Sequence, residues 1–200
     1  MDNDQDRLLR EITKEGNFWQ LFRMAFSVDF TLANKLIPIF TFVVVFLVNI
    51  PVKGQGLSFD DVASSVKDFI GWNFTILGFM IAGYAIFTTV TSADLSLALM
   101  KKCERVTGLP YLKYIHAVFL KAILVFLLAN VPPLLCSEFI KKVGLVNMLF
   151  SDLGEWQGYC FAFFHAVNVS LFILALAMLK SYIFNIYASV MMAVRWSARN

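Results

Sequence analysis

The sequence predicts an all-α polytopic membrane protein with four transmembrane helices, and three observations support this fold class. Hydrophobic residues make up 59% of the 200 residues, while charged residues make up only 16%. The mean hydropathy is +0.70, well above the range of soluble domains of this length. Four apolar runs are each long enough to cross a bilayer, which takes about 20 residues at about 1.5 Å per residue.

The four predicted spans are residues 32–52, 70–92, 114–136 and 158–180. The first is marginal in length, so we expect the Lys35 ammonium to reach the interface while its alkyl stem stays in the apolar layer. The fourth run continues past Lys180 without Gly or Pro, which predicts an extended last helix of about 40 residues. The predicted division of the chain is an N-terminal segment over 1–31, a transmembrane domain over 32–180 and a helical extension over 181–200.

Basic residues are distributed unevenly between the two predicted sides of the membrane. Twelve precede or open span one, lie between spans two and three, or end or follow span four, whereas four lie in the other two loops. Because cytoplasmic loops carry the excess of Lys and Arg, both termini and the middle loop are predicted to be cytoplasmic. The net charge of +3 therefore reflects topology rather than nucleic-acid binding.

Two segments outside the spans have the pattern of helices that lie on a membrane surface. Phenylalanines recur at every fourth position over residues 18–26, which is typical of an interfacial helix. Ser58 and Asp61 have the spacing of a helix cap, and apolar residues over 59–70 share one side. We expect this second segment to be a short outer-surface helix that ends at Gly71.

The second span carries small residues along one face, at alternating spacings of three and four. This is the spacing of a seam on a helix, and small side chains allow the close backbone approach that holds helices together in lipid. The partner of this seam is either another span of the same chain or the second span of neighbouring copies. The repeat suits a left-handed bundle. The seam consists of Thr75, Gly78, Ala82, Ala85 and Thr89, and continues to Ser92.

No motif in the sequence indicates an enzyme. There is no Gly-rich phosphate loop, no His-Glu-x-x-His and no Gly-x-Ser-x-Gly. The histidines fall in different spans and the cysteines are scattered singly, so no metal site is predicted. No Asp or Glu lies inside a predicted span, which disfavours a coupled ion pump. We expect a protein that is not an enzyme and that uses no cofactor or metal ion.

Polar residues inside the predicted spans are candidates for function. Lys121 either extends to the interface or faces a helix interface or a wet cavity. His165 and Asn168 approach from the outer side while Lys121 approaches from the inner side, so direct pairing between them stays open.

Two cysteines are candidates for a disulfide on the predicted outer side. Cys136 ends span three and Cys160 begins span four. An oxidising periplasm would allow them to join the two helices if their Cα atoms lie within about 7 Å, and otherwise both stay free thiols.

A docking platform is predicted on the cytoplasmic side, where a basic edge in the middle loop and an apolar face near the C-terminus would both contribute. The two arginines in the last turns are either partner contacts or inner-leaflet anchors. The acidic residues of the N-terminal segment are either part of this platform or a solvated tail. The predicted docking residues are Lys101, Lys102, Arg105, Met191, Met192, Arg195, Trp196 and Arg199.

The layout of the chain resembles a known family. Four spans with both ends inside, the segment "ILGFMIAGYAIFTTVTSADL" in span two, the basic inner segment "LMKKCERVTG" and the extended last helix are similar to KwaA, the membrane subunit of the Kiwa anti-phage defence system. The resemblance implies a homotetramer in the bacterial inner membrane that works with a cytoplasmic DNA-binding protein, KwaB, to detect infection and suppress phage replication.

The function expected from these observations is a non-enzymatic membrane sensor and scaffold that docks a soluble effector and does not itself bind nucleic acid. The first alternative is a small oligomeric channel whose pore is lined by the seam, with Lys121 or His165 affecting conduction. The second alternative is an assembly factor for another membrane complex.

Overall fold

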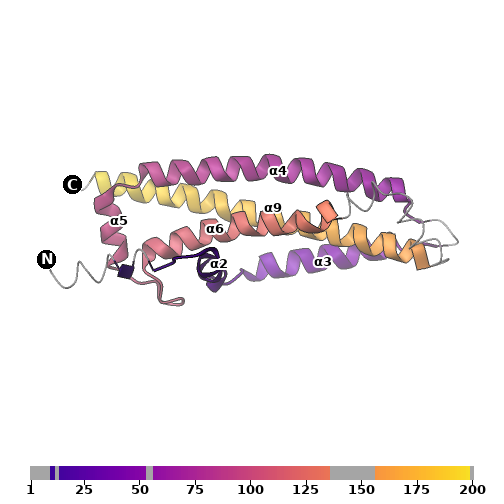
Figure 1. Cartoon of the computed structure of the whole chain (residues 1–200), viewed down its shortest axis with the longest axis horizontal. Coiled ribbons are helices and arrows are strands. Elements are labelled where there is room, and N and C mark those ends of the chain that lie inside the picture. Colours follow the sequence, from indigo (N-terminus) through magenta and orange to yellow (C-terminus); the bar gives the residue numbers. More distant parts are fainter. Residues whose placement is uncertain (1–9, 12–13, 53–55, 136–155, 199–200) are drawn as a thin grey trace. The chain divides into compact units, whose positions relative to one another are not determined.

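The computed structural model describes residues 10–11, 14–52, 56–135 and 156–198 (Figure 1). Within these residues the chain contains no β-strand, which confirms the all-α prediction for this part of the protein. The helices are α2 (Phe18–Ser27), α3 (Leu32–Val48), α4 (Phe59–Val90), α5 (Ala93–Met100), α6 (Tyr111–Ala129) and α9 (Trp156–Ser197).

Among the described residues, three helical segments are long and apolar enough to cross a membrane. They are α4, the segment Tyr111–Leu135 that contains α6, and α9, and the count rises to four if α2 and α3 together form one broken span. The structure thus supports a membrane protein with several spanning helices. The orientation of these helices stays a prediction.

Helix α3 is shorter than the predicted first span over 32–52. Thr31 caps its N-terminus by accepting a hydrogen bond from Asn34 N at 3.3 Å. Asn49 ends the helix, because its amide Nδ2 donates to Val45 O at 2.8 Å and Pro51 follows two residues later. With 17 residues, α3 falls just short of the length that spans a typical bilayer.

Helix α4 is continuous over 32 residues, so the predicted short helix that ends at Gly71 is wrong. The predicted cap is present, because Ser58 N donates to Asp61 Oδ2 at 2.9 Å and Asp61 N donates to Ser58 Oγ at 3.2 Å. A glycine inside a helix costs only about 1 kcal/mol relative to alanine, and the packing of α4 before and after Gly71 outweighs that cost. Helix α9, in turn, has the predicted uninterrupted extension and reaches 42 residues.

Contacts between residues divide the chain into two compact units. Unit 1 consists of Met1–Asp29, Phe79–Leu124 and Leu179–Asn200, and unit 2 consists of Phe30–Gly78 and Val125–Met178. The three long helices each contribute residues to both units. The division predicted from the sequence, by position relative to the membrane, is of a different kind and stays a prediction.

In unit 2, α9 is the common partner of α3 and α4. Helix α3 runs antiparallel to α9, since Phe42 contacts Phe163 with ring centroids 5.7 Å apart and Ser170 Oγ donates to Pro38 O at 2.7 Å. Helix α4 runs parallel to α9. Its contacts are Phe59 with Phe161, at 6.2 Å, and Phe69 with Phe172, at 5.1 Å.

In unit 1, aromatic residues of α4, α6 and α9 form the core. Phe87 and Phe119 have centroids 4.9 Å apart, and Phe119 also contacts Tyr182 at 5.2 Å. Tyr84 Oη and His116 Nδ1 lie 2.8 Å apart, which links α4 to α6 by a hydrogen bond. The order of these contacts along the chain makes α4 and α6 antiparallel.

Candidate functional site

The small-residue seam of α4 faces away from the rest of the chain. All five of its residues are exposed, and a Cβ built on Gly78 would meet nothing within 4 Å. This exposure favours the interpretation in which the seam packs against neighbouring copies, and the partner of the seam stays a prediction. The predicted seam residues are Thr75, Gly78, Ala82, Ala85 and Thr89.

The buried face of α4 lies on the other side of the helix. Asn73, Leu77, Met80 and Phe87 are all buried, and at about 100° per residue they lie about 165° around the axis from the seam. Helix α4 thus has one face for the core of its own chain and a second, opposite face with small side chains. Large exposed side chains such as Phe79, at 74% exposure, flank the seam.

Threonine hydroxyls in and beside the seam bond to their own helix. Thr75 Oγ1 donates to Gly71 O at 2.9 Å, and Thr89 Oγ1 donates to Ile86 O at 2.8 Å. This satisfies each hydroxyl without a partner from outside α4, so the threonines can lie in an apolar environment. The seam is therefore a narrow, largely apolar surface.

Helix α4 makes a close contact inside the chain at Gly83, a residue that the spacing of the seam does not include. A Cβ at Gly83 would lie 2.8 Å from Ile186 Cδ1 and 3.2 Å from Tyr182 Oη. The Tyr182 hydroxyl donates a hydrogen bond to Met80 O one turn away. The signal in the sequence was a second glycine that does not share the three-and-four spacing of the seam.

The predicted basic loop is an ordered turn, here called the basic hairpin, over residues 101–110. Cys103 and Pro110 form an antiparallel bridge, and Glu104 N donates to Leu109 O at 2.8 Å. Gly108 has φ = 68°, a left-handed conformation that favours glycine and closes the turn. The backbone of this loop is therefore held by its own hydrogen bonds.

The carboxylate of Glu104 organises the tip of the basic hairpin. Its Oε2 accepts hydrogen bonds from Thr107 N at 2.6 Å, from Val106 N at 2.9 Å and from Thr107 Oγ1 at 2.9 Å. The backbone N–H groups of Thr107 and Val106 favour the ionised form and lower the pKa of Glu104. Val106 stands at the tip with 83% of its surface exposed.

The described docking residues all belong to unit 1. Lys101, Lys102 and Arg105 are exposed on the basic hairpin, and Arg195 is exposed near the end of α9. Among the apolar residues, Met191 is exposed, while Met192 and Trp196 are half-buried. Met192 lines a cavity of about 70 Å³ with Tyr111, Tyr114 and Ser189. Arg199 lies outside the described residues.

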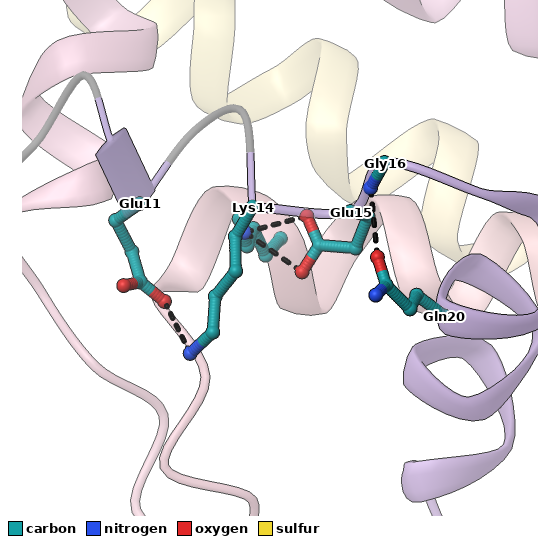
Figure 2. Close-up of polar contacts among 6 residues, drawn as sticks. Glu11, Lys14, Glu15, Gly16 and Gln20 are labelled. Carbon is teal, nitrogen blue, oxygen red and sulfur yellow. Dashed lines mark hydrogen bonds and ion pairs between the residues drawn. The ribbon is translucent and has the colours of Figure 1, made fainter.

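Two lysines of α6 hold the N-terminal segment in unit 1. Lys113 Nζ lies 2.6 and 2.8 Å from the two carboxylate oxygens of Glu15, and Figure 2 shows the two dashed lines at that carboxylate. Lys121 is 3% exposed, donates to Val28 O and lies 5.8 Å from the centroid of the Phe26 ring. The structure supports the interpretation in which Lys121 faces a helix interface, and not the one in which its side chain extends to the membrane surface.

Just ahead of α2, a local hydrogen bond shapes the same segment. Gly16 N donates to Gln20 Oε1 at 2.8 Å, as Figure 2 shows, and Asn17 caps α2 by accepting from Gln20 N at 2.9 Å. The first turn of α2 is thus fixed directly after Glu15. A helix is present over the predicted residues 18–26, with Phe18 and Trp19 exposed, and its location at a membrane surface stays a prediction.

His165 and Asn168 belong to unit 2. Asn168 is 2% exposed and donates from Nδ2 to Phe164 O of its own helix at 2.9 Å, whereas His165 is half-buried. Cys160 is half-buried at the start of α9, and Cys136 lies outside the described residues, so their disulfide stays a prediction. The part of the chain that the structure describes holds no cluster of three or more metal-ligating side chains.

Comparison of the chain with protein-family models, with curated proteins and with solved structures gave no match. The candidate site is therefore defined by its own geometry, namely the exposed seam of α4 and, in unit 1, the basic hairpin.

Proposed function

We propose that this protein is an oligomeric, non-enzymatic sensor and scaffold of the bacterial inner membrane, similar to KwaA, that docks a cytoplasmic DNA-binding effector. The observation that carries the proposal is the exposed seam. Helices in lipid associate where small residues let their backbones approach, and the residues of this stripe are exposed, with open space where a Cβ on Gly78 would lie. A neighbouring copy is the partner that the stripe fits.

The length and flanks of the seam support contact between copies. From Thr75 to Thr89 the seam rises about 21 Å at about 1.5 Å per residue, which is most of the hydrocarbon layer. Phe79 and Ile86 stand exposed beside it and can cover the sides of a close helix contact. Closed symmetry around an axis presents the same stripe in every copy, and the resemblance to KwaA favours four copies.

The basic hairpin supports the docking part of the proposal. Its three exposed cations surround a backbone that Glu104 already orders, so little conformational entropy is lost when a partner binds. Exposed Val106 supplies an apolar contact beside these charges. A partner with an acidic surface and a shallow apolar pocket is complementary to this tip.

Assembly is tested by changing the seam. We expect Gly78→Leu and Ala82→Leu to abolish the oligomer, because the added side chains separate the two backbones, and Phe79→Leu to leave it nearly unchanged. Native mass spectrometry in detergent measures the number of copies. If both leucine variants assembled like the parent, the seam would not be the interface.

Docking is tested by charge reversal. A variant with Lys101→Glu, Lys102→Glu and Arg105→Glu should insert normally but lose the effector in a pull-down, and Lys67→Glu serves as a control on the opposite predicted side. Removal of residues 183–200 tests the apolar face in the same way. Full recovery of the effector by both variants would rule out this surface.

A second candidate is an oligomeric channel, and the exposed seam favours it as well, since the same face could line a pore between copies. Ion flux into liposomes separates the two functions. A scaffold carries no selective current, and a channel carries one that changes when Thr75→Val or Thr89→Val alters the seam.

A further inference from the structure

Unit 2 contains buried amides whose oxygens have no partner. The Oδ1 atoms of Asn73, Asn130 and Asn168 make no hydrogen bond within the described residues, although the three side chains are 1%, 2% and 2% exposed. A buried polar atom without a partner costs about 1–3 kcal/mol, and more in an apolar layer without water. Three such atoms in one unit therefore indicate a partner of another kind.

Hydrogen bonding fixes the orientation of the Asn130 amide. Its backbone N–H bonds to Leu127 O at 3.2 Å, and its side-chain Nδ2 donates to Phe126 O at 2.7 Å. Exchanging the nitrogen and the oxygen would lose this second bond, so the assignment is determined by the network. The Asn130 atom without a hydrogen-bond partner is thus the acceptor Oδ1, and the corresponding atom of Asn73 is its Oδ1.

The helix register brings Asn73 and Asn130 to the same level. Along the antiparallel α4 and α6, Tyr84 contacts Phe119 with ring centroids 6.0 Å apart. Asn73 lies eleven residues before Tyr84, and Asn130 lies eleven residues after Phe119, directly after the last residue of α6 and within the helical segment Tyr111–Leu135. Eleven residues make about three turns with only about 20° left over, so both asparagines keep the facing sides of their helices.

A group that binds between Asn73 and Asn130 must donate hydrogen bonds to their Oδ1 atoms, and it must be small and neutral. Two amide oxygens without a carboxylate cannot offset the dehydration of a cation, which costs several kcal/mol or more in an apolar environment. The side chains are too deeply buried for a second copy of the chain to reach them. Water meets all these conditions, because one molecule donates twice.

We propose that Asn73 and Asn130 form a binding site for a buried water molecule that bridges their two Oδ1 atoms. The water links α4 to the third span within unit 2. Asn168 lies on α9 at another level, because the contact between Phe69 and Phe172 places Asn73 near Ala175, two turns away.

A double-mutant cycle in detergent tests the bridge. We expect Asn73→Leu and Asn130→Leu each to lower the equilibrium constant for folding about tenfold, and the double variant to lose clearly less than the two effects combined, since both remove the same molecule. A cycle between Asn73→Leu and Asn168→Leu, which share no water, should be additive. Additive effects in the first cycle would overturn the bridge.

The sign of the single substitution is equally decisive. If the Asn73 oxygen has no partner at all, replacing the amide by the similarly sized leucine stabilises the protein, and that result would overturn the proposal.

A measurement on the parent protein tests the proposal even if the variants fail to fold. In protein labelled with ¹⁵N-asparagine, the Asn130 side-chain amide should give a cross-relaxation peak with a long-lived water. Absence of this peak in the folded parent would also overturn the proposal.

Discussion

At the scale of single residues, two glycines five positions apart on α4 have opposite surroundings. A Cβ on Gly83 would lie against Tyr182 and Ile186, whereas a Cβ on Gly78 would meet nothing within 4 Å. We expect Gly83→Leu to destabilise the folded monomer by about 1–3 kcal/mol through overpacking, and Gly78→Leu to leave it unchanged. Chemical unfolding in detergent under conditions that keep both variants monomeric measures the difference. Equal stabilities for the two variants would contradict the packing described for Gly83.

The Tyr182 hydroxyl provides a second prediction at this scale. Tyr182 is buried and donates to Met80 O, so Tyr182→Phe should cost about 1 kcal/mol of unfolding free energy. Tyr187 is exposed, and Tyr187→Phe is therefore the matched control with little expected effect. A larger loss for the control would show that the hydroxyl of Tyr182 contributes nothing specific.

The Glu104 carboxylate gives the basic hairpin a pH dependence with a defined sign. Hydrogen bonds from the Thr107 and Val106 N–H groups lower the pKa of Glu104 from its ordinary value of 4.5. The resulting stabilisation is fully present above pH 4.5 and is lost as the pH falls through the lower pKa of the folded state. NMR shifts of the two amides should titrate below pH 4.5 in the parent and not titrate in Glu104→Gln. Titration at or above that pH in the parent would contradict the assignment.

The residue patterns predicted which small side chains share a face, but not which face is buried. A spacing of three and four identifies a stripe on any helix, and lipid, a neighbouring copy and the chain's own core all accept small residues. Gly83 could not be assigned to the core, because its role depends on Tyr182 and Ile186, about a hundred positions away. The bond from Lys121 to Val28 O was equally invisible, since a backbone carbonyl carries no sequence signal.

At the scale of elements, the sequence predicted the cap at Ser58 and Asp61 correctly. It placed the end of α3 too late, and it predicted a break in α4 at Gly71 where the helix is continuous. The cap of Ser58 and Asp61 was recognised because both partners are close in sequence. Helix α4 contacts α9 on both sides of Gly71, since Phe69 and Trp72 both contact Phe172, and these long-range contacts outweigh local propensity. The length of α3 was overestimated, since hydropathy continues to Val52 although Asn49 and Pro51 end the helix.

The pair of Lys113 and Glu15 gives a prediction for how the N-terminal segment attaches to α6. The Lys113 side chain is 8% exposed and that of Glu15 is 18% exposed. Glu15→Gln leaves a buried ammonium without its counter-charge and should release the segment, at a cost of about 3 kcal/mol. Lys113→Met should cost less, because Glu15 can turn to water. Hydrogen exchange over α2 measures the release, and equal exchange in the two variants would contradict the asymmetry.

At the scale of the whole molecule, the charge distribution predicts an orientation that the fold alone does not determine. Three helical segments are long and apolar enough to span a membrane, but a helix bundle can insert either way, and only the asymmetry of Lys and Arg distinguishes the two sides. The basic hairpin should therefore lie in the cytoplasm, where the proposed effector is. The opposite orientation would leave the basic hairpin without access to the proposed effector.

Thiol labelling tests this orientation with a residue that the structure already exposes. Cys103 lies on the basic hairpin and is a free, exposed cysteine, so a variant with Cys136→Ala and Cys160→Ala carries a single reporter. A membrane-impermeant maleimide should label it in inverted vesicles and not in intact cells. Lys67→Cys with Cys103→Ser moves the reporter to an exposed position on α4 near the opposite predicted surface and should reverse the result. Labelling of Cys103 in intact cells would place the basic hairpin outside, and with it neither the predicted topology nor docking of a cytoplasmic effector could hold.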